Sequence, residues 1–195
     1  MSESPFVLPP APRALEVTRD RVRLRPFEER DLDAMAAYRG DAEVCRYLPF
    51  EPQTPDDIRG RIGQLLGRTS LEGERAGLIL VIERVSDGRV VGDLVLFHLD
   101  PQAGSAEIGW VVSPAVAGQG LATEAVRALI DTAFGVYGLR RLTARIDAEN
   151  ARSLALAERV GMRREAHHIE NAWSKGRWSD ELVYALLSRE WTPRA

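Results

Sequence analysis

The sequence predicts one α/β (α+β) domain, in which a mixed, mostly antiparallel sheet of about seven strands is flanked by about four helices. Two consecutive strand–helix units between residues 106 and 160 require a parallel crossover between their strands. Hairpin-like strand pairs on either side of these units, within about 78–97 and 162–187, add antiparallel neighbours. The length, 195 residues, suits a single core.

The first forty residues are expected to form an arm, a strand and a helix. Residues 1–17 contain several prolines and no sustained apolar run, so we expect a flexible or lightly docked arm, followed by a single domain over 18–195. Residues 22–26 alternate in polarity and end in proline, which is typical of a short strand. Acidic residues from Glu28 onward open a helix, where they face the positive end of its dipole, and Gly40 ends it.

A second helix and three strands follow. Thr54 can cap a helix that begins with Pro55 and has aspartate as its third residue, and apolar residues then recur at helical spacing. The segments 78–83 and 90–97 are rich in strand-forming residues, and a Ser-Asp-Gly turn joins them, which predicts a hairpin. Residues 106–112 form the next expected strand.

The C-terminal half alternates helices with strands before it ends in a hairpin. A long amphipathic helix is expected over about 120–135 and a strand over 141–146. A shorter helix over about 150–160 starts at an asparagine cap and ends before a glycine. Two final strands, about 162–171 and 180–187, are joined by a polar turn.

The composition excludes several classes of function. The net charge of -3 provides no electrostatic footprint for nucleic acid or an anionic membrane. No apolar run reaches the ~18 residues that a membrane-spanning helix needs, and the N-terminus does not resemble a signal peptide, so we expect a cytoplasmic protein. The one cysteine, Cys45, and three histidines have no metal-binding spacing, and we expect Cys45 to pack rather than to act as a nucleophile. Lys175 is the only lysine.

The turn that precedes the helix at 120–135 carries two glycines, Gly118 and Gly120. A helix start presents unpaired backbone N–H groups and a partial positive charge, and glycine lets an anion approach that backbone closely. The turn therefore indicates a phosphate or pyrophosphate cradle. It lacks the Gly-Lys-Ser/Thr of a P-loop, and Ala122 and Thr123 depart from Gly-x-Gly-x-x-Gly. A plain glycine-rich turn before a packed helix is the alternative interpretation.

This turn resembles the signature loop of the GNAT superfamily of N-acetyltransferases, whose pattern is Arg/Gln-x-x-Gly-x-Gly/Ala. Gly120 and Ala122 match the fourth and sixth positions, while Ala117 replaces the favoured Arg or Gln. The resemblance implies that backbone amides of the loop hold the pyrophosphate of acetyl-coenzyme A (acetyl-CoA), so the departure at Ala117 should weaken the cradle only modestly. The residues that would supply these amides are Gly118, Gln119, Gly120, Leu121, Ala122 and Thr123.

Two neighbouring segments extend the resemblance. In the family, the strand before the loop splays from its parallel neighbour and pairs with the pantetheine arm, which implies this role for Trp110, Val111 and Val112. A later helix start is similar to the family's Asn-x-x-Ser pattern, which would place Asn150 near the pantetheine and the hydroxyl of Ser153 near the sulfur. Apart from the resemblance, Asn150 would be only an N-cap and Ser153 a polar residue of the first turn.

The two ends of the chain narrow the resemblance to one branch. Residues 165–191 and 23–26 look like the branch that contains the ribosomal-protein N-terminal alanine and serine acetyltransferases, so the likeness covers about residues 20–191. It implies an acyltransferase that moves an acetyl group from acetyl-CoA to a primary amine, either a protein N-terminal α-amine or a small-molecule amine. We expect no metal, because the histidines and the cysteine have no ligand spacing, and a homodimer built through the C-terminal hairpin is a further expectation. A non-catalytic acyl-CoA-binding or regulatory module is the alternative, and a nucleotide-binding protein is disfavoured because the Walker lysine is missing.

Acyl transfer to an amine needs a base for the amine, a donor for the carbonyl oxygen and a proton for the departing thiolate. The resemblance implies that Ser153 protonates or stabilises the departing thiolate. It also implies that a backbone N–H of Val111 or Val112 donates to the carbonyl oxygen. Glu107, on the same strand, is the first candidate base, and a salt-bridged strand residue is its alternative interpretation. The acidic helix start that includes Asp31 could attract a cationic amine, but a solvated helix start explains it more simply.

A second candidate base lies in the C-terminal hairpin. Some members of the branch carry a carboxylate at the position that is Ala172 here, and Glu170, two residues away on the same face of a strand, could substitute for it. His167 and His168 could accept a proton near neutral pH. Adjacent strand residues point to opposite faces, so at most one of these histidines can enter the site.

Overall fold

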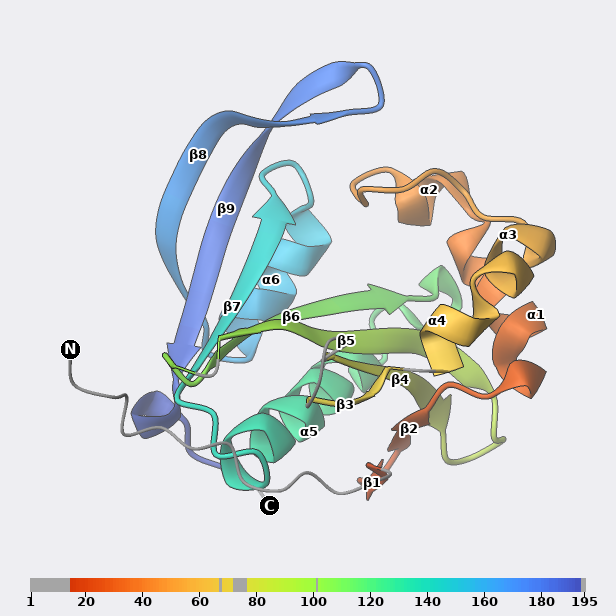
Figure 1. Cartoon of the computed structure of the whole chain (residues 1–195), viewed down its shortest axis with the longest axis horizontal. Helices are drawn as coiled ribbons and strands as arrows, with labels where there is room; N and C mark the ends of the chain where they lie inside the picture. The colour runs from red at the N-terminus through yellow and green to blue at the C-terminus, as the bar shows by residue number, and fades with distance from the viewer. Residues whose placement is uncertain (1–14, 67, 72–76, 101, 194–195) are drawn as a thin grey trace.

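The chain forms one mixed sheet with helices on both faces (Figure 1). The computed structural model describes residues 15–66, 68–71, 77–100 and 102–193. The strands are β1 (Val17–Thr18), β2 (Val22–Pro26), β3 (Thr69–Ser70), β4 (Gly77–Arg84), β5 (Val90–Asp100), β6 (Ser105–Val112), β7 (Arg141–Asp147), β8 (Arg163–Ser174) and β9 (Arg177–Leu187). The α-helices are α1 (Leu32–Arg39), α2 (Ala42–Cys45), α3 (Pro55–Gly60), α4 (Ile62–Leu66), α5 (Leu121–Gly135) and α6 (Ala151–Arg159). The 3₁₀ helices are η1 (Glu29–Asp31), η2 (Pro114–Val116) and η3 (Ser188–Glu190).

The sheet confirms the predicted class. Within the described residues its strands run in the order β1-β2-β4-β5-β6-β7-β9-β8, and β3 pairs with β4. Every one of these pairs is antiparallel except β6 with β7. The seven expected strands are all present, and the two additional strands, β1 and β3, have two residues each.

The parallel pair diverges in the middle of the sheet. β6 and β7 pair over three residues only, starting at Ser105 and Arg141. Beyond this stretch β6 stays paired with β5 as far as Val112, and β7 stays paired with β9 as far as Asp147. The two strands therefore splay, as expected, and their facing backbone edges are left for another partner.

Two apolar clusters cover the two faces of the sheet. α5 places Ala125 and Leu129, both fully buried, against one face, which includes Leu80 of β4. Met35 of α1 packs on the other face, which includes Val81 of β4. Successive β4 residues thus point to opposite cores, which explains why that strand is a continuous apolar run. Full burial of each leucine, valine or methionine side chain among them contributes about 1.5–3 kcal/mol.

The second predicted helix begins where the sequence indicates. Thr54 Oγ1 accepts a hydrogen bond from Asp57 N at 3.2 Å, and Asp57 Oδ2 accepts one from Thr54 N at 2.8 Å. The helix then breaks into α3 and α4 at Arg61. Gly60 precedes the break, where glycine disfavours a continued helix, and no residue of α4 is buried to hold it together.

The N-terminal segment is docked at the residues that the structure describes. Leu15 is only 5% exposed, and Val17 pairs with Leu24 of β2. The last part of the expected arm over 1–17 therefore packs on the sheet, while residues 1–14 lie outside the described residues. Among the described helices, none combines the length and the apolar character needed to cross a bilayer.

Candidate active site

The glycine turn joins the splayed strand β6 to α5. Gly118 and Gly120 have φ angles of +75° and +78°, in the left-handed region. Gly120 is the N-cap of α5, and its carbonyl accepts a hydrogen bond from Glu124 N at 3.1 Å. The N–H groups from Leu121 to Thr123 have no acceptor within the helix, because helix geometry leaves the first turn unpaired. These N–H groups can bind an anion.

A guanidinium lies beside this turn. Arg21 donates from Nη1 to the Gln119 carbonyl at 2.8 Å and from Nε to Glu124 Oε2 at 2.7 Å. An alanine Cβ built at Gly120 would lie 3.3 Å from Arg21 Nη2. Arg21 therefore neutralises the Glu124 carboxylate at the helix start, so that this carboxylate does not cancel the partial positive charge of the first turn.

The splayed edge of β6 presents alternate backbone amides. Ser113 N donates to the Val91 carbonyl at 2.8 Å, so the Ser113 amide faces β5. Amide directions alternate along a strand, so the amide of Val111 also faces β5, while those of Trp110 and Val112 face away from it. Of the two expected donors to the thioester carbonyl, only Val112 therefore points its N–H toward the gap between β6 and β7.

A cavity of about 440 Å³ lies between the diverging strands. Its walls include β6, β7, the start of α6, residues 46–50 and the β8–β9 hairpin. It brings together several residues that the sequence singled out, namely Glu107, Trp110, Val111, Asn150 and Ser153. Val112 and the turn at 118–123 are not among its lining residues, because they lie further along β6 and beyond its end.

Ser153 is held in place from two sides. Trp110 Nε1 donates to Ser153 Oγ at 3.2 Å, and Asn150 Oδ1 accepts from Ser153 N at 3.1 Å. Asn150 thus acts as the N-cap of α6. Because an indole N–H can only donate, Ser153 Oγ is the acceptor, and the hydroxyl hydrogen can be donated to a group in the cavity.

A buried carboxylate that the sequence reasoning missed lines another wall. Asp93, 1% exposed, accepts from Tyr38 Oη at 2.9 Å and from Arg39 Nε at 3.2 Å. Burial raises the pKa of Tyr38 well above its usual value. Burial alone would lower the pKa of Arg39, but the Asp93 carboxylate outweighs it and the net shift is upward. The sequence feature that could have indicated this buried carboxylate is an aspartate inside the otherwise apolar run 90–97.

Other charged side chains of the cavity form ion pairs. Arg145 Nη2 lies 2.6 Å from Glu181 Oε1, and Arg177 Nη2 lies 3.3 Å from Asp147 Oδ2. The hydrogen bond that Arg145 donates to Glu181 raises the pKa of Arg145, and the charge of Glu107 adds to this shift. Glu107 thus lies within electrostatic range of the Arg145 guanidinium.

The C-terminal hairpin places its candidates differently from expectation. Glu170 has a φ of +48° within a break in the β8–β9 register, so it does not share a face with Ala172. Ala172 lines the cavity, whereas Glu170 is exposed and is not part of the lining. His167 Nε2 lies 2.8 Å from Asp180 Oδ2, and neither His167 nor His168 lines the cavity.

Two further residues lie away from the cavity lining. Asp31 is 3% exposed and accepts hydrogen bonds from Arg25 Nη1 at 2.7 Å and Nη2 at 2.8 Å, so the interpretation as a solvated helix start is wrong for this residue. Cys45 is buried, its Sγ donates to the Arg39 carbonyl at 3.0 Å, and burial raises the pKa of its thiol. A thiol with a raised pKa is a poor nucleophile, which agrees with a packing role.

The sequence profile of the family described as "Acetyltransferase (GNAT) domain" matches residues 21–163. Three curated relatives are similar over nearly their whole length. "Uncharacterized N-acetyltransferase YnaD" of Bacillus subtilis is 30% identical over 91% of this chain and 99% of the relative. "Putative ribosomal N-acetyltransferase YdaF" of Bacillus subtilis is 29% identical over 88% of this chain and 94% of the relative. "Spermidine N(1)-acetyltransferase" of Escherichia coli is 25% identical over 87% of this chain and 88% of the relative.

Solved structures share the fold. The crystal structure of a GNAT-family acetyltransferase from Bacillus anthracis superposes with a TM-score of 0.81 at 28% identity. The match covers 90% of this chain and 100% of that protein.

Proposed function

Since this chain belongs to the GNAT acetyltransferase family and is therefore an acyltransferase, we propose that it transfers an acetyl group from acetyl-CoA to a primary amine. The observation that carries this proposal is the sequence of binding groups along the splayed edge of β6. The Ser153 hydroxyl lies in the cavity, the amides of Trp110 and Val112 follow along the strand, and the glycine turn comes after its end. Their order matches the thioester, pantetheine and pyrophosphate of one acetyl-CoA molecule.

In this proposal the coenzyme is bound mainly by backbone. The amides of the glycine turn bind the pyrophosphate, and Arg21 neutralises the nearby Glu124 carboxylate, which would otherwise repel it. The pantetheine pairs with the open edge of β6 like an additional strand. Asn150 fixes the start of α6, so that Ser153 faces the thioester. The residues assigned to the coenzyme are Trp110, Val112, Gly118, Gly120, Leu121, Ala122, Thr123, Asn150 and Ser153. The sequence also predicted Val111 and Gln119, but the Val111 amide faces β5 and the Gln119 amide donates to the Val116 carbonyl at 3.3 Å.

The chemistry needs few protein groups. The N–H of Trp110 faces the gap beside Ser153, where it stabilises the negative charge that develops on the carbonyl oxygen, whereas Val112 lies beyond the cavity. Ser153 donates its hydroxyl hydrogen to the departing thiolate, because Trp110 already occupies its oxygen as a donor. Glu107 accepts the proton of the attacking amine, directly or through water. We prefer Glu107 to Glu170 as the base, since Glu107 lines the cavity and Glu170 does not.

The balance of charge around the cavity favours an α-amine of a peptide over a polyamine. Five acidic and five basic side chains are among the described residues that line it. Asp93, Asp147 and Glu181 each already have an arginine partner. A polyamine would need unpaired carboxylates for its several charges, whereas a peptide offers one amine and a neutral backbone. The similarity to the ribosomal N-acetyltransferase branch supports the same choice.

A thiol-release assay tests this proposal. The protein is incubated with acetyl-CoA and, in separate reactions, peptides with N-terminal alanine or serine, spermidine and small amines. We expect thiol release with the peptides and an acetyl group on their α-amine. Binding of acetyl-CoA without release on any acceptor would instead support the non-catalytic module, which the apolar Ala172 in the cavity would suit. The single domain over 18–195 and the homodimer stay predictions, which limited proteolysis and sedimentation would check.

A further inference from the structure

The only lysine among the 195 residues lines the proposed active-site cavity. Lys175 is the first residue of the two-residue turn between β8 and β9, with a φ of +52°, and Gly176 follows at +77°. Turns of this kind favour Asn, Asp or Gly, and a positive φ is uncommon for lysine. Turn geometry therefore does not explain why a lysine stands here.

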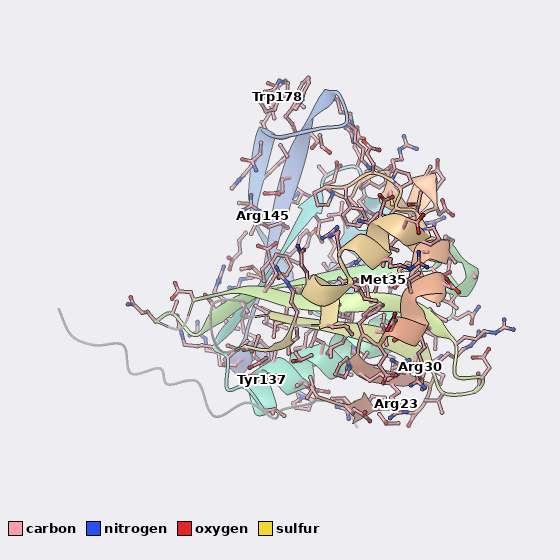
Figure 2. All side chains as sticks on the ribbon, turned by 45° about the vertical axis from the view of Figure 1, so that its right-hand side comes forward. Arg23, Arg30, Met35, Tyr137, Arg145 and Trp178 are labelled. Atoms are coloured by element: carbon pink, nitrogen blue, oxygen red, sulfur yellow. The ribbon has the colours of Figure 1, made fainter. Side chains whose placement is uncertain are left out.

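The Lys175 side chain extends from the hairpin toward the opposite wall. Its Nζ donates to the carbonyl of Cys45, at the end of α2 and next to the wall at 46–50. Figure 1 shows the hairpin and α2 facing each other above the sheet, and Figure 2 shows Trp178 at the hairpin tip. The ammonium of Lys175 is thus held at the cavity, between its two walls.

The same hairpin tip is tied to the turn that precedes Ser153. Arg177 Nη2 lies 3.3 Å from Asp147 Oδ2 and 3.1 Å from Glu149 Oε2. These two acidic residues lie within three residues before Asn150, the cap of α6. Lys175 has a flexible four-carbon stem, so rotation of its side chain can redirect the nitrogen from the Cys45 carbonyl into the cavity.

We propose that Lys175 is a self-acetylation site, whose ε-amine takes the acetyl group of bound acetyl-CoA. This rests on the acetyltransferase function proposed above. The ammonium gives a proton to a cavity carboxylate or to water, and its nitrogen bonds to the thioester carbonyl carbon. The C–S bond breaks, and the thiolate takes up a proton. Acetyl-lysine and coenzyme A are the products, and one proton is released. The product has lost the positive charge, which weakens the bond to the Cys45 carbonyl.

The full-length protein, freed of coenzyme, is incubated with acetyl-CoA in the absence of any amine acceptor. Intact mass, peptide mapping and thiol release are followed over time. We expect one acetyl group per chain, located at Lys175, with one thiol released for each. Peptide mapping distinguishes Lys175 from the N-terminal amine. The rate should not depend on protein concentration, because the transfer occurs within one chain.

Two variants serve as controls. Lys175→Arg keeps the positive charge but removes the nucleophilic amine, and it should incorporate no acetyl group at this position. The double variant Lys175→Arg, Arg89→Lys moves the only lysine to the β4–β5 turn, where the Arg89 side chain is 79% exposed and does not line the cavity. Uncatalysed acetylation would label this exposed lysine at least as fast as Lys175, whereas transfer in the cavity leaves it unlabelled.

The outcomes separate this inference from the function on which it rests. Thiol release with an added amine, together with an unmodified Lys175, would overturn self-acetylation and leave the proposed function standing. Equal labelling of Lys175 and the relocated lysine would also overturn it. Absence of both thiol release and labelling, with every acceptor, would overturn the two proposals together.

Discussion

Replacing Gly120 by alanine tests the coenzyme cradle. Its effect on the affinity for acetyl-CoA can be separated from the loss of stability that any residue with a left-handed φ causes. Gly88, in the β4–β5 turn, is a matched control, since its φ is +69° and that of Gly120 is +78°. An L-residue in this conformation costs about 1–2 kcal/mol, so both variants should lose that much free energy of unfolding. For a chain of this length each kcal/mol lowers the Tm by roughly 2–4 °C.

The two variants should differ in their affinity for acetyl-CoA. An alanine Cβ at Gly88 meets nothing within 4 Å, and at Gly120 it approaches only the end of the Arg21 side chain, so neither variant clashes with the backbone. Alanine at position 120 relieves part of its strain by rotating the adjoining peptide planes. This rotation turns one of the backbone N–H groups that bind the pyrophosphate away from it. One hydrogen bond to a charged group is worth about 1.5–3 kcal/mol. Its loss raises the Kd about tenfold to about a hundredfold.

Calorimetric titration with acetyl-CoA measures the Kd, and thermal unfolding measures the stability of the same samples. The expected pattern is a similar loss of Tm in Gly120→Ala and Gly88→Ala, with a weaker Kd in Gly120→Ala alone. A Gly120→Ala protein that is less stable yet binds acetyl-CoA as the wild type does would refute the cradle. Weaker binding in both variants would show that the loss of affinity comes from the general loss of stability and not from a change in the turn before α5.

Three further changes test other parts of the site and the core. Ser153→Ala should lower kcat by roughly 10²-fold, as expected for loss of a proton donor, with the Kd for acetyl-CoA nearly unchanged in calorimetry; an unaltered kcat would remove Ser153 from the mechanism. Asp93→Asn should lower the free energy of unfolding by about 3–5 kcal/mol in urea titrations, because Arg39 would keep its charge in a buried place without its partner; a change below about 1 kcal/mol would contradict this role. Tyr137, on the chain just after α5 (labelled in Figure 2), has a buried hydroxyl with no hydrogen-bond partner within the described residues, and burial raises its pKa to about 12. Tyr137→Phe should therefore raise the free energy of unfolding by about 1 kcal/mol at neutral pH. Since the folded-state pKa lies above the ordinary value of 10.0, the wild type binds more protons when folded and loses stability as pH rises from 10 toward 12, and the variant should lose less; equal losses in urea titrations across that range would contradict the assignment.

Features that depend on neighbouring residues could be predicted from the sequence. The cap at Thr54, the glycine turn before α5 and the asparagine cap of α6 all involve contacts within a few residues. Apolar periodicity located the long strands and helices for the same reason. β1 and β3 escaped prediction because two residues carry no readable period.

Features that depend on distant pairing could not be predicted in this way. Asp93 lies more than fifty residues from Tyr38 and Arg39, so its buried network appears only once α1 packs on β5. The bulge at Glu170 turns that side chain away from the face of Ala172, and nothing in the local sequence marks it. Lys175 lies in the site because the hairpin extends to the wall next to Cys45. The contact between Lys175 and Cys45 joins residues 130 positions apart.

The most direct test of the central claim is the heat of binding of acetyl-CoA to the wild-type protein, measured next to Gly120→Glu. The turn at the start of α5 should bind one molecule per chain, and the added carboxylate at position 120 should abolish binding while thermal unfolding still shows a cooperative transition. No heat of binding with the wild type, or equal affinity in the two proteins, would contradict the assignment of this turn to the coenzyme.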